Sequence, residues 1–194
     1  MDELFLLPNA PVAMPRAYWM KDKPNFLSSQ LVLVEPSEFE MQRVNQAFEN
    51  LADDEYDMEI VNNLYRESCI VIPHRGYGLL TGEFRAEEHH LYLGSKEELW
   101  DPDLVLAEAK YVHFSDWPMP KPWISATQEQ KDTSAPKCRV HDDGTEDCRD
   151  RYRWFSLYHD FRARREVSDE PCEARSSSML IFQQAVCGTG FVQR

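Results

Sequence analysis

The strongest indication of the fold class is the run Leu31-Val32-Leu33-Val34, four apolar residues with no polar alternation. Side chains along a strand alternate between its two faces, so this run predicts a strand that is apolar on both. Interior strands of this kind are covered by helices on each side. The run therefore predicts an α/β fold in which it is an interior strand. A second run, Val12-Ala13-Met14, is set among prolines and is predicted to be an edge strand.

Helical patterns follow this strand. Ser37 with Glu40 three residues later is a capping-box signature, and it predicts a helix from about 37 to 51 whose apolar face is Met41, Val44, Phe48 and Leu51. A second helix is predicted from about 57 to 66 and a short one from 103 to 109. Further strands are predicted at Cys69 to Pro73 and at Tyr111-Val112. Residues 126–146 are predicted to be a surface loop, 147–166 a helix, and 167–194 an unassigned tail.

A histidine and a lysine occupy the two ends of a proline-stiffened loop. The loop follows the Tyr111-Val112 run and reads His113-Phe114-Ser115-Asp116-Trp117-Pro118-Met119-Pro120-Lys121-Pro122-Trp123. An imidazole can coordinate a divalent cation and an ammonium neutralises phosphate oxygens, so the loop is suited to grip a metal-bound diphosphate. The alternative is that His113 is a hydrogen-bonded structural residue at the end of a strand.

The charge of the chain excludes some classes of partner. Acidic residues outnumber basic ones 34 to 21, which gives a formal charge of −13. Such an excess argues against a surface that binds nucleic acids or anionic membranes in general. Any bound phosphate must therefore be neutralised by a positive charge close to it, such as Lys121 or a metal ion. The sequence contains no apolar run of transmembrane length, and its first fifteen residues lack the basic start and apolar stretch of a signal peptide.

Five cysteines leave at least one thiol unpaired. Cys69 lies in an apolar run, which is typical of a buried free thiol. Cys138 and Cys148 flank a polar loop that contains a glycine, and they are predicted to form a disulfide. The alternative to a disulfide is a zinc site formed by these two cysteines and His141, but no fourth ligand stands at a recognisable spacing. The state of Cys172 is left open.

Two charged segments are candidate binding sites. His89-His90 stands beside Glu87-Glu88, but adjacent residues point in different directions, so a solvated turn is predicted rather than a metal cluster. The arginines of the 147–166 segment could form a basic patch for nucleic acid. Acidic neighbours offset them, and cations near the C-terminal end of a helix also suit its dipole.

Four blocks of sequence, in order along the chain, carry a family resemblance. They are Met1 to Phe5, Phe26 to Ser37, Asp54 to Asn62, and the loop from His113 to Trp123. Together they resemble family 8 glycosyltransferases of the glycogenin-like kind, and within them the fungal Golgi N-acetylglucosaminyltransferase branch. The loop is similar to the family's His-Phe-x-Gly-x-x-Lys-Pro-Trp motif, and the first block to the segment that follows its metal-binding Asp-x-Asp.

The resemblance implies a fold and an activity. Residues 1–125 are expected to be the C-terminal part of a GT-A type nucleotide-diphospho-sugar transferase fold, a mixed sheet with flanking helices. The activity implied is retaining, metal-dependent transfer of N-acetylglucosamine or a related sugar from a UDP-sugar to a glycan acceptor. Mn²⁺ or another divalent cation is the implied cofactor.

Residue roles follow by motif position. His113 is expected to bind the metal, and Lys121, Ser115 and Trp123 to bind the donor. Asp57 and Asp54 are expected near the reacting centre, where helix capping is the alternative for both. Two departures stand out: Asp116-Trp117 occupies the place of the family's Gly, and Leu27 replaces an Asn, so acceptor specificity is expected to differ from that of glycogenin.

The resemblance also implies parts outside this sequence. The family's N-terminal nucleotide-binding half and its Asp-x-Asp are expected upstream of Met1, so the chain alone is expected to be inactive. A Golgi lumenal location with an N-terminal membrane anchor is implied, or a cytoplasmic one if Met1 is the true start. A non-catalytic remnant or interaction module of the same fold is the alternative function, and the oligomeric state stays open.

Overall fold

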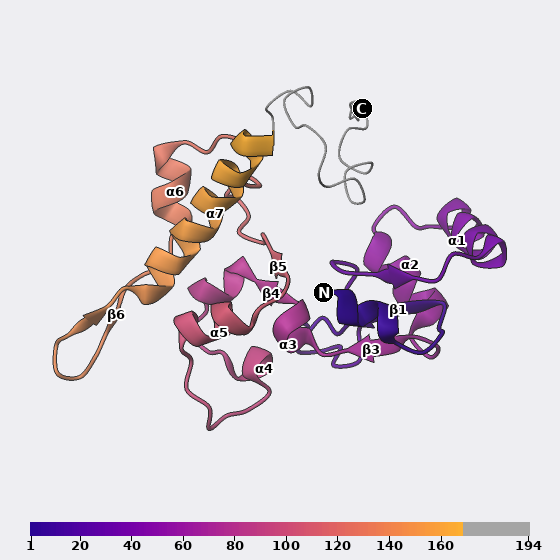
Figure 1. Cartoon of the computed structure of the whole chain (residues 1–194), viewed down its shortest axis with the longest axis horizontal. Coiled ribbons are helices and arrows are strands. Elements are labelled where there is room, and N and C mark those ends of the chain that lie inside the picture. Colours follow the sequence, from indigo (N-terminus) through magenta and orange to yellow (C-terminus); the bar gives the residue numbers. More distant parts are fainter. Residues whose placement is uncertain (169–194) are drawn as a thin grey trace, which may run out of the picture.

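The structure, a computed structural model, describes residues 1–168, so Cys172 and all but the first two residues of the expected tail lie outside it. The elements gather into two groups, here called the N-terminal lobe (1–73) and the C-terminal lobe (74–168). Figure 1 shows β1 to β3 with α1 and α2 on one side, and α4 to α7 on the other. Helices flank small sheets, one of which contains both a parallel and an antiparallel pair, so the fold class is mixed α/β.

A three-stranded sheet forms the centre of the N-terminal lobe. Its strands are β1 (Val12–Pro15), β2 (Leu33–Val34) and β3 (Ile70–Ile72), in the order β2-β1-β3. β1 pairs antiparallel with β2 and parallel with β3. A short 3₁₀ helix, η1 (Asp2–Leu6), precedes β1 and contributes Leu4 to the core.

The strand order reverses two predictions. The Val12 segment, predicted at an edge, is the central strand and is buried along its whole length. The Leu31 run, predicted in the interior, pairs through only two residues at the edge, where Val34 is 55% exposed. An apolar run reports that a strand has apolar faces but not how many neighbours it has, because the neighbours come from distant parts of the chain.

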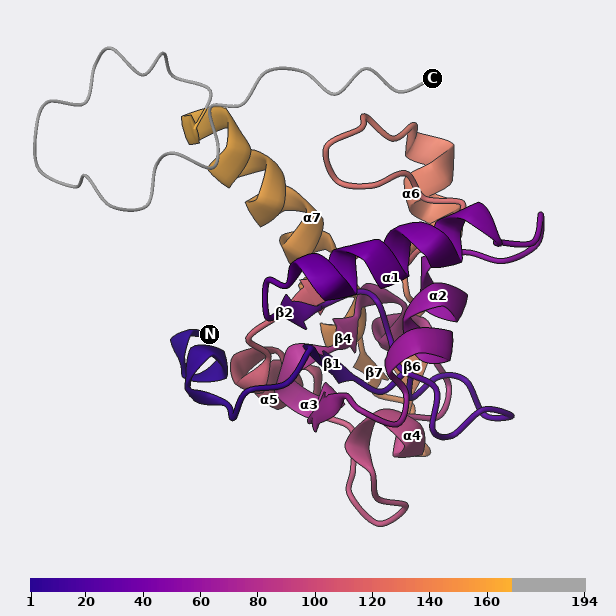
Figure 2. The ribbon, with the colours of Figure 1, turned by 90° about the vertical axis from the view of Figure 1, so that its right-hand side faces the viewer.

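Both predicted helices of this lobe form, as α1 (Glu38–Glu49) and α2 (Asp57–Tyr65). The Ser37 hydroxyl accepts a hydrogen bond from the Glu40 backbone N–H at 3.4 Å, which confirms the predicted cap. The predicted apolar face of α1 is only partly buried. Val44 packs on the core, but Met41 is 61% and Phe48 56% exposed, because α1 lies at the outer edge of the molecule with α2 as its main neighbour (Figure 2).

The C-terminal lobe is built from short elements around one aromatic core. Two parallel strands, β4 (Leu79–Leu80) and β5 (Val112–His113), pair beside the kinked helix α3 (His74–Tyr77) and the 3₁₀ helix η2 (Thr81–Arg85). The helices α4 (His90–Leu93), α5 (Pro102–Glu108) and α7 (Arg149–Ser168) surround them. Their buried side chains include Leu79, Phe84, Tyr92, Val105, Trp154 and Tyr158.

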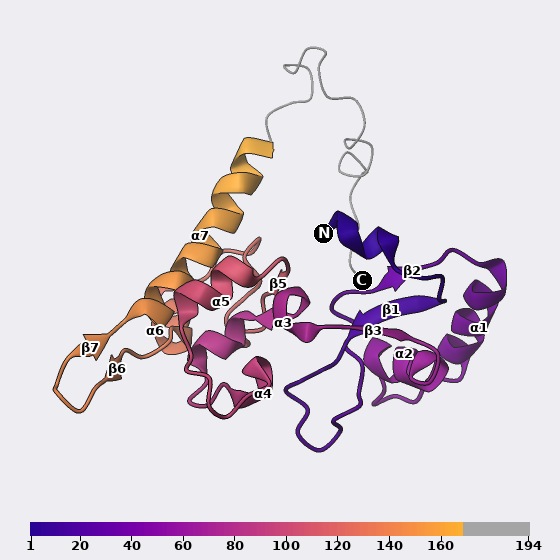
Figure 3. The same ribbon diagram turned by 60° about the horizontal axis from the view of Figure 1, so that its bottom comes forward.

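The segment 126–146, expected to be a surface loop, contains regular structure. Thr127 and Gln130 form a reciprocal capping box at the start of α6 (Gln128–Ser134). The strands β6 (Arg139–Val140) and β7 (Glu146–Asp147) then form a hairpin at the end of the molecule remote from the N-terminal lobe (Figure 3). These elements are short and polar, so they leave no apolar periodicity in the sequence.

A disulfide between Cys138 and Cys148 closes this hairpin, as predicted, and Cys69 is a free, half-buried thiol. Both cysteines of the pair are therefore used, which excludes the rival zinc site in this structure. Within residues 1–168, the helices are too short or too polar to cross a lipid bilayer.

Candidate functional site

A cavity of about 810 Å³ brings together residues of both lobes. Three of the residues predicted from the sequence line it, namely Asp57, His113 and Ser115. Asp54, Lys121 and Trp123 are not among its lining residues. The remaining lining side chains with polar or aromatic groups are Trp19, Ser28, Ser29, Gln30, Glu83 and Tyr111.

Asp57 is the first residue of α2, and its side chain is exposed to the cavity. The carboxylate of Glu59, rather than that of Asp54 or Asp57, accepts the hydrogen bond of the Tyr56 N–H at 3.1 Å and caps the helix. An acidic residue in the first turn is still favoured by the helix dipole. Asp57 is thus free of a capping hydrogen bond and available to a ligand.

Asn62 fixes the cavity side of α2 to the segment beside β1. Its side chain is buried and forms two hydrogen bonds with the backbone of Leu27, to the N–H at 2.7 Å and to the carbonyl at 2.9 Å. Leu27 itself is buried in the core with Val12, Met14 and Tyr65. The position that carries an Asn in the resembled family is therefore a packing residue here, and the adjacent Ser28 to Gln30 segment lines the cavity instead.

His113 ends β5 and is half-buried against the cavity. Burial, helped by the nearby Lys121 ammonium, lowers the pKa of the imidazole below its usual 6.5. The neutral imidazole is the form that binds metals, so His113 is in a suitable state to be a ligand.

Ser115 and Gly82 form a close contact in the cavity wall. The Ser115 hydroxyl accepts a hydrogen bond from the Gly82 N–H at 3.0 Å, and the Ser115 N–H donates to the Thr81 hydroxyl at 2.9 Å. A Cβ at position 82 would lie 3.0 Å from the Ser115 oxygen, so glycine allows this approach. The contact joins η2 to the loop after β5.

The rest of the loop is anchored away from the cavity. The Lys121 ammonium donates to the Phe114 carbonyl, and Trp123 packs against Phe161 of α7 at 6.0 Å between ring centres. Asp116 accepts a hydrogen bond from the Tyr158 hydroxyl at 3.0 Å, and burial, followed by the nearby Asp116 carboxylate, raises the pKa of Tyr158. The departure from the family's Gly thus has a structural reason: Asp116 ties the loop to α7.

The described residues do not bring a complete metal site together at the cavity. The group of three potential ligands whose atoms lie within 4.8 Å of one another is Cys138, Glu146 and Cys148, and its two cysteines form the disulfide. Among residues 1–168 no such group includes His113. A Mn²⁺ ion at His113 would need oxygen ligands from elsewhere.

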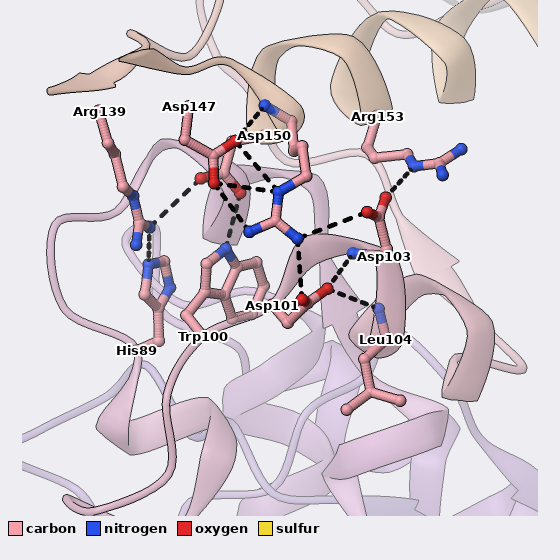
Figure 4. Close-up of polar contacts among 10 residues, drawn as sticks. His89, Trp100, Asp101, Asp103, Leu104, Arg139, Asp147, Asp150 and Arg153 are labelled. Atoms are coloured by element: carbon pink, nitrogen blue, oxygen red, sulfur yellow. Dashed lines mark hydrogen bonds and ion pairs between the residues drawn. The ribbon is translucent and has the colours of Figure 1, made fainter. Parts of the chain in front are cut away.

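The prediction of a solvated turn at His89-His90 is wrong for His89. His89 is buried, its ring stacks on Trp100 at 4.0 Å between ring centres, and its Nδ1 lies 3.0 Å from Glu83. Figure 4 shows its other side facing Arg139 of the hairpin. Glu87 and Glu88 are exposed, as the prediction of a turn requires. Because these two glutamates precede His89 directly, the local composition gave no sign that its imidazole is buried.

The arginines of α7 are neutralised where they meet α5 and the hairpin. Arg149 forms ion pairs at 2.8 Å with Asp101 and with Asp147. Arg153 pairs with Asp103, as Figure 4 shows. These contacts leave little unpaired positive charge at this end of the helix. They agree with the expectation that acidic neighbours offset the basic residues.

Comparison with curated proteins finds fungal relatives. A protein named glucose N-acetyltransferase 1 from Aspergillus fumigatus is 50% identical over 179 residues, which cover 86% of this chain and 47% of the relative. A protein of the same name from Gibberella zeae is 48% identical over 164 residues, covering 83% of this chain and 36% of the relative. The chain spans about half, or less, of the length of these relatives. No family model matches the chain, and no solved structure does so.

Proposed function

We propose that this chain, which is similar over most of its length to fungal proteins named glucose N-acetyltransferase 1, forms one side of a glycosyltransferase active site. The reaction is retaining transfer of N-acetylglucosamine, or a related sugar, from a UDP-sugar to a glycan acceptor. In this proposal the chain is the C-terminal part of a GT-A fold of the glycogenin-like family 8. The part of the relatives that this chain does not cover supplies the nucleotide-binding side.

One observation carries the proposal: Asp57 lines the same cavity as His113 and Ser115, although it lies more than fifty residues before them in the sequence. Asp57 belongs to the block from Asp54 to Asn62 and the other two to the loop from His113 to Trp123, so their meeting is a property of the fold. The identity to the fungal relatives supports the branch of N-acetylglucosaminyltransferases. The cavity supports a small polar ligand, because its wall combines carboxylates, hydroxyls and aromatic rings.

The residues of this chain would act through position and charge. His113 offers a neutral imidazole, and a divalent cation bound there would stabilise the negative charge that develops on the departing diphosphate. The Asp57 carboxylate lines the cavity from the N-terminal lobe, whereas His113 belongs to the C-terminal lobe. It would face the positive charge of the reacting sugar carbon or accept a hydrogen bond from the acceptor hydroxyl. Lys121 would reach the phosphates only after releasing the Phe114 carbonyl.

The proposal includes a compartment. A Golgi lumenal location follows from the resemblance, and the disulfide between Cys138 and Cys148 suits an oxidising lumen.

The test uses a chimera in which the uncovered part of the Aspergillus fumigatus relative is joined to this chain. Transfer of N-acetylglucosamine from its UDP derivative to a glycan is measured with and without Mn²⁺. We expect His113→Ala and Asp57→Asn each to lower kcat by about 100-fold or more, as for loss of an electrostatic group in a catalytic site. Acetyl transfer, which the relatives' name denotes literally, needs an acetyl donor that this assay omits, so a glycan product that has gained the mass of N-acetylglucosamine distinguishes the two reactions.

His141→Ala is the matched control, because His141 is an exposed imidazole in the hairpin. It should leave the activity and the Mn²⁺ requirement unchanged. If His113→Ala kept the parent's turnover and Mn²⁺ dependence and lost only thermal stability, His113 would be a structural residue at the end of β5 and the proposed metal role would be refuted.

A second candidate function is an interaction module without catalysis. The exposed Met41 and Phe48 of α1 favour it, because large apolar side chains at the surface often mark contact areas. An inactive chimera that retains this chain's fold, together with tight binding of the uncovered part of the relative to this chain, would favour the second function over the first.

A further inference from the structure

The charge of the cavity wall limits what it can hold. None of the lining residues that the structure describes is Lys or Arg, whereas two of them, Asp57 and Glu83, carry carboxylates. Without a bound cation, such a wall repels a phosphate and is complementary to hydroxyl donors.

Glu83 is the more constrained of the two carboxylates. Its side chain is only 9% exposed, yet it lines the cavity. The Tyr18 hydroxyl donates a hydrogen bond to Oε2 at 3.0 Å, and His89 Nδ1 lies 3.0 Å from Oε1. Burial and the adjacent Glu83 raise the pKa of Tyr18, so its hydroxyl keeps its proton and remains a donor. Each oxygen still has a second lone pair.

The hairpin determines how His89 meets Glu83. Arg139 contacts His89 Nε2, and a guanidinium can only donate hydrogen bonds. Nε2 is therefore the acceptor and Nδ1 carries the proton that goes to Glu83. Asp150 holds both neighbours of His89 in place: Trp100, which stacks on His89, donates to Asp150 at 2.7 Å, and Arg139 pairs with Asp150 at 3.3 Å (Figure 4).

A second, independent feature of the cavity is the side-chain amide of Gln30, which has no hydrogen-bond partner among the described residues. Gln30 lines the cavity, and both polar atoms of its side-chain amide are buried. The amide approaches Gly78 so closely that a Cβ there would lie 2.6 Å from Nε2. The cavity is thus lined by an amide, a fixed carboxylate and the Trp19 ring, and groups of these kinds bind sugars, because the polar groups pair with sugar hydroxyls and a ring can cover an apolar sugar face.

We propose that Glu83 binds a hydroxyl of a neutral sugar in this cavity and that Tyr18 and His89 are positioning residues that hold its carboxylate in place. Gln30 contributes the second polar contact. The identification of this sugar as the glycan acceptor rests on the proposed function, whereas the binding itself is a property of this chain.

The test measures binding to the whole chain rather than transfer. Glucose and glucose 1-phosphate are a matched pair of probes that differ by one anionic group, and their binding is followed by ligand-observed NMR titration. We expect glucose to bind more tightly than its phosphate. Glu83→Gln should weaken glucose binding by about 10-fold, as for loss of a hydrogen bond to a charged group. It should also reduce the ratio of the affinity for glucose to the affinity for glucose 1-phosphate.

Two further variants separate binding from folding. Glu87→Gln is the control, because Glu87 is an exposed glutamate four positions away in the sequence. It should behave as the parent chain. Tyr18→Phe keeps the ring and removes one donor to Glu83, so it should weaken glucose binding by a smaller factor than Glu83→Gln and keep the preference for glucose over its phosphate. This variant tests the proposal even if Glu83→Gln does not fold.

The proposal is overturned if the parent chain binds neither probe, if it prefers the phosphate, or if folded Glu83→Gln has the parent's affinities. These outcomes are distinct from failure of the proposed function. A chimera that transfers sugar while Glu83→Gln leaves binding unchanged refutes only the role of Glu83. Glucose binding that depends on Glu83, together with a chimera that is inactive, refutes only the transferase.

Discussion

Asn62 is a single residue on which one wall of the cavity depends. Its buried amide pairs with both backbone groups of Leu27 and with the Met58 carbonyl at 2.7 Å. Asn62→Ala would leave the Leu27 N–H and carbonyl buried without partners, so it should lower the free energy of unfolding by about 2–4 kcal/mol. Urea denaturation measures this change.

The neighbouring Asn63 provides a matched control, since it has the same side chain but is exposed. Asn63→Ala should change the free energy of unfolding by less than about 0.5 kcal/mol. Equal effects of the two substitutions would mean that the contacts of Asn62 with Leu27 do not stabilise the chain.

The titration of His113 gives a second test on a single residue. The pKa of His113 in the folded chain is lowered below 6.5, first by burial and then by Lys121. The unfolded chain therefore binds this proton more readily. The stability that this group contributes is present above pH 6.5 and decreases as the pH falls toward the lowered folded pKa.

NMR titration of the imidazole C–H signals measures the pKa of His113 directly. Lys121→Gln removes the nearby ammonium and should raise that pKa part of the way toward 6.5, while Lys137→Gln, at an exposed lysine, should not change it. A value at or above 6.5 in the parent chain would contradict the burial of His113 seen in the structure.

Among the elements, the β6–β7 hairpin depends on a covalent closure. Reduction of the Cys138–Cys148 disulfide should lower the free energy of unfolding by about 2–3 kcal/mol, because opening so short a loop restores entropy to the unfolded chain. Denaturation with and without reductant measures the loss, and non-reducing digestion with mass spectrometry identifies the linked peptide. Quantitative alkylation of Cys138 without reductant would exclude the pairing.

The hairpin also shows how an element acts at a distance from the cavity. Arg139 directly follows Cys138 and contacts His89, which in turn contacts Glu83 in the cavity wall. Opening the disulfide should therefore disturb His89 more than a surface imidazole such as His159. The chemical shifts of the two imidazoles, followed in the same reduced sample, allow the comparison.

At the scale of the whole molecule, the exposed apolar groups of the N-terminal lobe determine whether the chain self-associates in solution. α1 exposes Met41 and Phe48, and the sheet has open edges at β2 and β3, where Val34 and Val71 are exposed. Open strand edges and apolar patches promote association. We expect the isolated chain to self-associate or to bind a hydrophobic dye, as measured by light scattering and dye fluorescence.

Met41→Gln with Phe48→Glu should reduce dye binding without lowering the melting temperature, because both side chains are largely exposed already. Leu79→Gln is the contrasting change, since Leu79 is fully buried and its substitution should destabilise the core. A monodisperse parent chain that binds no dye would show that these apolar groups do not drive association.

Local signals in the sequence were sufficient for several features of this protein. The cap at Ser37, the helical periodicity after it, and the spacing of Cys138 and Cys148 each act within a few residues, and the structure contains the helices and the disulfide that they predicted. The family resemblance, rather than these local signals, pointed to Ser115 and Asp57, and both line the cavity with His113.

Contacts between distant segments decided the rest. The central position of β1, the burial of His89, and the turning of Lys121 toward the Phe114 carbonyl depend on partners that no short window of sequence contains. The same is true of Glu83, which joins the cavity only because η2 meets Tyr18 and His89 there. Capping and periodicity are properties of neighbours along the chain, whereas burial and strand order are set by packing across it.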